Sequence, residues 1–397
     1  MQNHYLKSHF ATEGEAVVEV DGVLREPAIA APVKRGELVS VQYLRAIAAL
    51  FVVTWHAAGE VGLHPMNALQ GGIELFLLIS GFIIWVISVD RPPSPGLFLK
   101  RRLARIVPFY WAITTAVVAL LLVRPGWFQT LKLQPAHVVA SYLFLPWRNP
   151  TPGVGLRPLV VPGWTLNYDM FFYLLFAVAL ALPRRWRAIG LIGALLTLPI
   201  AGIWLGGLSD ALTFYTSPLL AEMAFGVVLA LVMARGDPPP ALAWLLLGGG
   251  AVLMVLGGEV WDGQGPQRLI LLCLPAAMVL AGAVGLDRAG RLPALPLLKR
   301  LGDASYSLYM IHPLMVSALA QLWKHAGGQG LPGWLFVALS LVATSIAGLI
   351  SHALVEKPLT EFLQYRLKLS KTRPSFPHPF GWALTRMLKN PSLVVRN

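Results

Sequence analysis

Long apolar segments recur along almost the whole chain and constrain its fold more than any other feature. A helix needs about 20 mostly apolar residues to cross the hydrocarbon core of a membrane. Backbone polar groups inside a bilayer must be satisfied within a helix or a closed barrel. We therefore expect an all-α polytopic membrane protein with about ten transmembrane helices, near residues 39–58, 73–89, 106–123, 168–182, 189–208, 213–233, 241–257, 268–286, 305–323 and 333–354.

The composition agrees with a protein whose main solvent is lipid. Hydrophobic residues make up 56% of the 397 residues and charged residues only 13%, whereas soluble domains carry about 25% charged residues. This excludes a soluble globular enzyme, a disordered regulator and a fibrous protein. The net charge of +13 would suggest a nucleic-acid partner, but basic residues of membrane proteins gather in cytoplasmic loops. The single cysteine, Cys273, excludes internal disulfides and cysteine-rich metal clusters.

The distribution of Lys and Arg predicts the orientation in the membrane. With the N-terminus inside, 25 of the 32 basic residues lie in segments expected on the cytoplasmic side and six lie in outer loops. The positive-inside rule then favours an even number of spans with both termini in the cytoplasm. We expect a cytoplasmic N-terminal tail at 1–38, a transmembrane domain at 39–358 and a cytoplasmic C-terminal tail at 359–397.

Ionisable side chains inside apolar segments are costly and mark candidate functional sites. Arg45 and His56 lie eleven positions apart in the first segment, so they share one helical face about 16 Å apart along the axis. Arg45 is expected toward the cytoplasm and His56 near the outer surface. Each alone has a structural interpretation, because Arg45 can extend to headgroups and His56 can mark the interface. The two together on one face favour a functional role.

Glu74 opens the second apolar segment, at the depth expected for His56. The connection between the two segments is short, so we expect them to be neighbours. A carboxylate beside an imidazole orients the ring and raises its basicity, and we expect Glu74 to act on His56 in this way. The structural alternative is a solvated carboxylate that interacts with a helix dipole.

A basic cluster precedes the third apolar segment and is expected at the inner membrane surface. It consists of Lys100, Arg101, Arg102 and Arg105. Each of these residues fits a topology anchor, whereas the group as a whole could hold the phosphates of an anionic ligand. Arg105 is the best placed for this role because it lies closest to the apolar segment.

Four polar or aromatic residues are expected at the outer mouth of the fourth segment, which should begin before Tyr168. They are Trp164, Asn167, Tyr168 and Asp169. A Trp side chain suits a sugar ring, and Asn and Asp can hydrogen-bond hydroxyls, although aromatic residues at this depth are also interface anchors.

The later segments carry further polar residues. Tyr306, Tyr309 and His312 follow one another at helical spacing near the inner face of the ninth segment. For His312, structural and functional interpretations are both open. Glu222, inside the sixth segment, must be paired or protonated.

In this order, the motifs resemble the acyltransferase-three family of integral-membrane sugar O-acyltransferases, over about residues 38–360. The stretches SVQYLRAIAALFVV and PGWTLNYDMFFYLLFA are most similar to its exopolysaccharide-production, ExoZ-like branch. The motifs are the Arg45 and His56 pair, ELFLLISGF from Glu74 to Phe82, RRLARIVP from Arg101 to Pro108, WTLNYDMFFY from Trp164 to Tyr173, SYSLYMIHPL, and Glu356-Lys357-Pro358.

The resemblance implies that an acyl group, usually acetyl from cytoplasmic acetyl-CoA, is transferred to a carbohydrate hydroxyl in the bacterial cytoplasmic (inner) membrane. It makes His56 the catalytic histidine and Arg45 its motif partner, and Asp169 stands where the family usually has Glu. No bound cofactor and no metal are expected, and polysaccharide-synthesis proteins are candidate partners.

These roles assign two ligands to the residues singled out above. We expect acetyl-CoA to contact Arg101, Arg102, Arg105 and Tyr306. We expect the acceptor, a polysaccharide or lipid-linked oligosaccharide, to contact Trp164, Asn167, Tyr168 and Asp169.

The sequence leaves open whether His56 removes the proton of the sugar hydroxyl directly or first takes the acetyl group itself. Two alternatives to this function also stay open. A polytopic transporter or flippase for a lipid-linked sugar would also have many spans and intramembrane charges, without any acyl chemistry. An O-acyltransferase with another donor, such as succinyl-CoA, would carry the same motifs.

Overall fold

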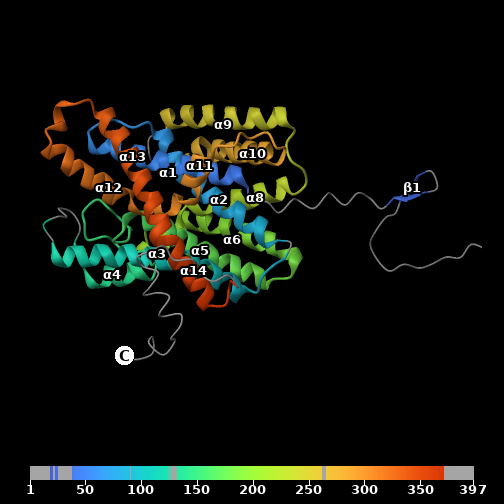
Figure 1. The fold of residues 1–397 in the computed structure, drawn as a ribbon. Coiled ribbons are helices and arrows are strands. Elements are labelled where there is room, and N and C mark those ends of the chain that lie inside the picture. Colours follow the sequence, from blue (N-terminus) through green and yellow to red (C-terminus); the bar gives the residue numbers. More distant parts are fainter. Residues whose placement is uncertain are drawn as a thin grey trace, which may run out of the picture. The chain divides into compact units, whose positions relative to one another are not determined.

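The computed structural model describes residues 18–20, 23–25, 38–89, 91–124, 126, 132–261 and 265–370 (Figure 1). Two short strands, β1 (Val18–Val20) and β2 (Val23–Arg25), pair antiparallel in a unit of their own. Two tails are expected, at 1–38 and 359–397. The rest of residues 1–37 and all of residues 371–397 lie outside the described residues.

From Leu38 onward the described chain is helical, as the apolar segments predict. The long helices are α1 (Val39–Glu60), α2 (Gly71–Ser88), α3 (Pro95–Val123), α5 (Trp164–Ala181), α6 (Arg184–Leu205), α8 (Leu219–Met233), α9 (Pro240–Val260), α10 (Leu274–Arg288), α12 (Ser305–His325) and α13 (Gly333–Ser351). Between or after them lie η1 (Asn67–Gln70), α4 (Pro135–Tyr142), η3 (Val161–Gly163), α7 (Asp210–Tyr215), α11 (Pro296–Asp303), η5 (Gly328–Gly330), α14 (Lys357–Arg366) and two π-helical turns, η4 (Leu269–Cys273) and η6 (His352–Glu356).

Nine helical segments of the described chain are long and apolar enough to cross a membrane. The one expected segment that is not among these nine, 305–323, also forms a helix, α12, which has 21 residues. It is less apolar than these nine because polar residues are spread along it, from Ser305, Ser307 and His312 to Gln321 and Lys324. Several of these, including Ser305, Ser307 and His312, are buried inside the protein. The predicted all-helical membrane fold is therefore confirmed.

Two helix boundaries differ from the expected ones. α3 begins at Pro95 instead of near residue 106, because Ser94 caps it and a proline suits the first helical turn. The basic cluster is therefore part of the helix. At the other end of the chain, the expected tail begins as helix α14, which packs against α3. The fourth span begins at Trp164, before Tyr168 as expected.

α1 lies at the centre of the packing and contacts α2, α11, α12 and α13. Its first turn is held by Asp287 at the end of α10, whose carboxylate accepts hydrogen bonds of 2.8 Å from both the backbone N–H and the hydroxyl of Ser40. An acidic group is favourable at a helix N-terminus because it meets the positive end of the helix dipole. α2 in turn packs closely on α8. Gly81 and Gly226 allow this approach, because a side chain at either position would collide with the backbone of the other helix.

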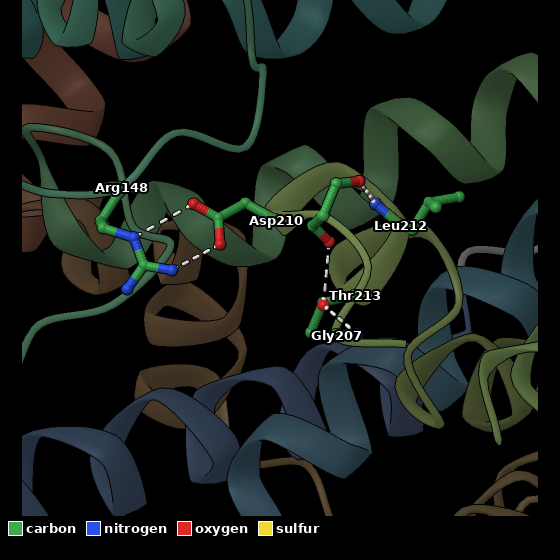
Figure 2. A network of polar contacts seen from close by, with 6 residues as sticks. Arg148, Gly207, Asp210, Leu212 and Thr213 are labelled. Carbon is green, nitrogen blue, oxygen red and sulfur yellow. Dashed lines mark hydrogen bonds and ion pairs between the residues drawn. The ribbon is translucent and has the colours of Figure 1, made fainter. Parts of the chain in front are cut away.

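An exposed ion pair connects the loop that follows α4 to α7 at the end of the protein where α5 begins. The guanidinium of Arg148 donates two hydrogen bonds to the carboxylate of Asp210, from Nη2 at 2.5 Å and from Nε at 3.1 Å (Figure 2). The hydroxyl of Ser209 caps α7, and the hydroxyl of Thr213 accepts a hydrogen bond from the backbone of Gly207. The pair is 71% and 43% exposed, so water already stabilises both charges.

A second ion-pair group is buried between three helices. The carboxylates of Glu74 on α2 and Glu222 on α8 are completely buried. Both are paired with the guanidinium of Arg268, which precedes η4: it donates to Glu74 and lies 3.3 Å from Glu222. The ring of Trp261 covers the guanidinium at 5.5 Å. The two carboxylates depend on Arg268, since neither lipid nor water can stabilise a charge that is completely buried.

We predict that Arg268→Met destabilises the protein strongly, because it leaves two carboxylates buried without their cation. Loss of one partner of a buried pair costs about 3–5 kcal/mol. Arg148→Met is the matched control, because it removes the exposed pair and should cost about 0–1 kcal/mol. The melting temperature of the purified protein in detergent measures both effects, and equal shifts for the two variants would contradict the prediction.

Candidate active site

α1 carries Arg45 and His56 on one side of an uninterrupted 22-residue helix. Both side chains are half-buried, and both face charged or titratable groups of other helices. Arg45 lies in the electrostatic reach of Arg105, Glu356 and Asp303. His56 is in contact with a ring from α12 instead. The two residues therefore belong to two polar layers, separated along α1 by about 16 Å.

The outer layer is built around His56. Its Nδ1 lies 2.8 Å from the carbonyl of Val52, one turn earlier. A carbonyl only accepts hydrogen bonds, so Nδ1 carries a hydrogen, and in the neutral ring Nε2 then carries the lone pair. The His312 ring of α12 is 4.8 Å away between centroids. The charge of Arg157, from the loop before α5, also acts on His56.

Two hydroxyls complete this layer. Thr165, at the start of α5, donates to the phenol oxygen of Tyr309 at 3.3 Å, and the ring of Tyr309 lies 5.7 Å from that of His312. His56 therefore has a free lone pair amid a cation, a second imidazole and two hydroxyls.

Glu74 has a different partner from the one we expected. Its carboxylate is bound to Arg268, and the described residues show no hydrogen bond between it and His56. The expectation that Glu74 orients the His56 ring is therefore wrong; the Val52 carbonyl holds the ring instead. The reason is that a fully buried carboxylate requires a full positive charge, which Arg268 supplies and a neutral imidazole does not.

The inner layer begins on α3. Arg102 is half-buried, and its guanidinium lies over the Phe98 ring at 5.6 Å. Arg101 and Arg105 are exposed, but the charges of both act on Arg102, and that of Arg105 also acts on Arg45. The arginines of the basic cluster therefore lie together with Arg45, at one end of the polar face of α1.

Asp169 belongs to this inner layer and not to the outer mouth. Its carboxylate is paired with the Ser80 hydroxyl and lies near the charges of Arg102 and Arg45. Because α5 starts at Trp164, five residues place Asp169 about 7.5 Å deeper than the helix start. One of its oxygens is buried without a hydrogen-bond partner.

The other three residues expected to bind the acceptor point in different directions. The Arg157 guanidinium lies 5.6 Å from the Trp164 ring, which puts Trp164 beside the outer layer. Tyr168 stacks on Phe214 of α7 at 4.0 Å. Asn167 is buried with neither amide atom hydrogen-bonded, and helical periodicity puts it on nearly the opposite side of α5 from Asp169. The expected group of four is therefore not a single cluster.

The inner layer also contains Tyr306 and Glu356. The Tyr306 hydroxyl donates to the Ile106 carbonyl at 2.9 Å, so it fixes α12 against α3. Glu356, in η6, accepts from Ser307 at 2.6 Å and contacts His352 Nδ1 at 3.0 Å. Its charge acts on both Arg45 and Tyr306, so it compensates part of the positive charge of this layer.

The sequence indicates no site role for Arg157 or Arg268 and leaves the role of His312 open. Arg157 lies in an irregular loop, where periodicity carries no information. Arg268 is the first residue of its apolar segment, where it reads as part of the outer loop. The helical spacing of Tyr306, Tyr309 and His312 was the available signal for His312, although its depth was misjudged: it lies beside His56 in the outer layer.

The chain is similar to several known proteins. A family model described as an acyltransferase domain matches residues 38–352. The exopolysaccharide production protein ExoZ of Rhizobium meliloti (strain 1021) is 37% identical over 311 residues, which cover 77% of this chain and 93% of that protein. Nodulation protein 10 of Rhizobium leguminosarum bv. viciae is 24% identical over 318 residues, or 72% of this chain and 81% of that protein. No solved structure matches.

Proposed function

Because this chain belongs to the acyltransferase-three family, we propose that it transfers an acetyl group from acetyl-CoA to a hydroxyl of an exopolysaccharide sugar or of its lipid-linked precursor. Similarity to a protein named for exopolysaccharide production, over most of both chains, supports the acceptor class. The observation that carries the proposal is the arrangement of two polar layers on one face of α1, one with a cluster of arginines and one with a histidine.

The inner layer suits the donor. Phosphates are bound well by guanidinium groups, which offer paired donors in a rigid plane. We assign the phosphates of acetyl-CoA to Arg101, Arg102 and Arg105, on the side of the membrane that the positive-inside rule makes cytoplasmic. Tyr306 contributes by holding α12 against α3, since its hydroxyl is engaged by a backbone carbonyl. The extended arm of the donor then runs past Arg45 toward His56.

The outer layer suits the acyl transfer itself. The free Nε2 of His56 removes the proton from the sugar hydroxyl, whose oxygen attacks the thioester carbonyl. The new C–O bond forms, the C–S bond breaks, and the proton passes from His56 to the sulfur of CoA. A positioned general base of this kind contributes typically about 10²–10⁴-fold to the rate. Trp164 lies close enough to this layer to support the sugar ring. Asn167, Tyr168 and Asp169 point in other directions, so we do not assign them a contact with the same ring.

We predict that His56→Ala abolishes most acetylation while the protein still inserts and accumulates in the membrane. The loss should be about 10²-fold or more, because no other group replaces the base. Arg45→Ala should instead raise the acetyl-CoA concentration needed for half-maximal rate. Both are measured with radiolabelled acetyl-CoA and membranes of a strain that lacks the chromosomal gene. Near-normal acetylation in His56→Ala would refute the assignment, and a panel of other acyl-CoA donors tests the choice of acetyl.

A second prediction follows from the ion pairs of Glu74. Glu74 and Glu222 share Arg268, so Glu74→Gln and Glu222→Gln should alter the acetylation rate to a similar extent, within about threefold of each other, which is well under 1 kcal/mol of activation free energy. Initial rates per amount of folded protein measure this. If only Glu74→Gln slowed the transfer, Glu74 would have a direct role at His56 that the ion pair does not explain.

A further inference from the structure

His312 is a buried histidine that the proposed reaction does not yet use. Its side chain is only 1% exposed, and its ring lies 4.8 Å from that of His56 between centroids, at an interplanar angle of 59°. Its Nε2 is buried and has no hydrogen-bond partner. Burying such an atom without a partner is unfavourable, and each instance in a native structure calls for an explanation.

The sequence itself fixes which nitrogen of His312 carries the proton. The next residue is Pro313, which has no N–H and cannot donate to the carbonyl of Tyr309 four positions earlier. The Nδ1 of His312 lies 2.6 Å from this carbonyl and fills the vacant place. Since a carbonyl only accepts hydrogen bonds, Nδ1 carries a hydrogen, and in the neutral ring the lone pair is on Nε2.

The two histidines therefore have the same tautomer. His56 Nδ1 is held by the Val52 carbonyl and His312 Nδ1 by the Tyr309 carbonyl. Both Nε2 atoms carry lone pairs, and two lone pairs cannot bond to each other. A hydrogen bond between the rings becomes available only when one of them gains a proton at Nε2.

We propose that His312 is a positioning residue for acyl transfer, whose Nε2 accepts a hydrogen bond from His56 once His56 has taken the proton of the sugar hydroxyl. The inference rests on the proposed function. The proton leaves the hydroxyl oxygen for His56 Nε2, is shared with His312 while the tetrahedral intermediate exists, and goes to the departing thiolate sulfur. His312 ends each cycle as it began, so no further reactant is required.

The hydrogen bond to His312 stabilises the positive charge of protonated His56, which exists only during the reaction. The positive charge of Arg157 already acts on His56, so protonated His56 needs a compensating acceptor. A hydrogen bond to a charged group is stronger than one between neutral groups. Interactions made only in the transition state raise kcat without changing substrate binding. Loss of His312 should therefore lower kcat and leave the KM for acetyl-CoA unchanged.

The test uses the full chain in membrane vesicles from a strain that lacks the chromosomal gene, with radiolabelled acetyl-CoA and the vesicles' own glycolipid as acceptor. We expect His312→Ala to lower kcat about 10–100-fold, with an unchanged KM for acetyl-CoA. His325→Ala is the matched control, because His325 lies on the same helix and makes the same type of bond to a backbone carbonyl, at 2.7 Å, but is exposed. It should keep the wild-type rate.

Chemical rescue separates this role from simple packing. Added imidazole should restore part of the rate of His312→Ala, whereas pyrrole, which has the same shape but no basic nitrogen, should not. Rescue by both compounds, or by neither, would overturn the proposal. His312→Gln is the second variant, since its amide oxygen supplies an acceptor with little loss of volume; a rate no better than that of His312→Leu would also overturn it. If the wild-type protein itself transferred no acetyl group, the proposed function would fail instead.

Discussion

The apolar interior of a membrane offers no partner for a charge, and this constraint determines the arrangement of the polar residues in the protein. Several charged groups of the described chain are paired with side chains from distant parts of the sequence. Asp287 holds the first turn of α1, Glu356 joins η6 to Ser307 on α12, and Arg268 connects α2 to α8 through two carboxylates. These contacts fix the helices around α1, and thereby fix the face that carries Arg45 and His56.

The same constraint explains why the candidate site has two layers. Cations gather at one end of the polar face of α1, where Asp169 and Glu356 compensate part of their charge. Neutral histidines and hydroxyls gather at the other end, where a transient proton can be held. A long donor with an anionic head and a reactive thioester at its far end matches this separation. Under the proposed function, a donor from one side of the membrane modifies an acceptor near the other.

Local features of this fold were predictable from the sequence, and long-range pairings were not. The apolar segments predicted the helices, and the spacing of Arg45 and His56 predicted their shared face. The partner of Glu74 was missed because Arg268 lies 194 residues away, beyond any periodicity. The depth of Asp169 depended on where α5 begins, which apolarity alone does not define. The role of Arg157 depends on the fold of a loop, which carries no repeating pattern.

The proposed function requires that the donor enters at the arginine layer on the cytoplasmic side while the acceptor is modified at His56. Membrane vesicles of opposite orientation test it most directly, with radiolabelled acetyl-CoA added only to the outside medium. Inverted vesicles expose the cytoplasmic face and should incorporate acetyl groups into glycolipid or polysaccharide, and sealed right-side-out vesicles should not. Equal incorporation in both orientations, or incorporation only in right-side-out vesicles, would contradict the account.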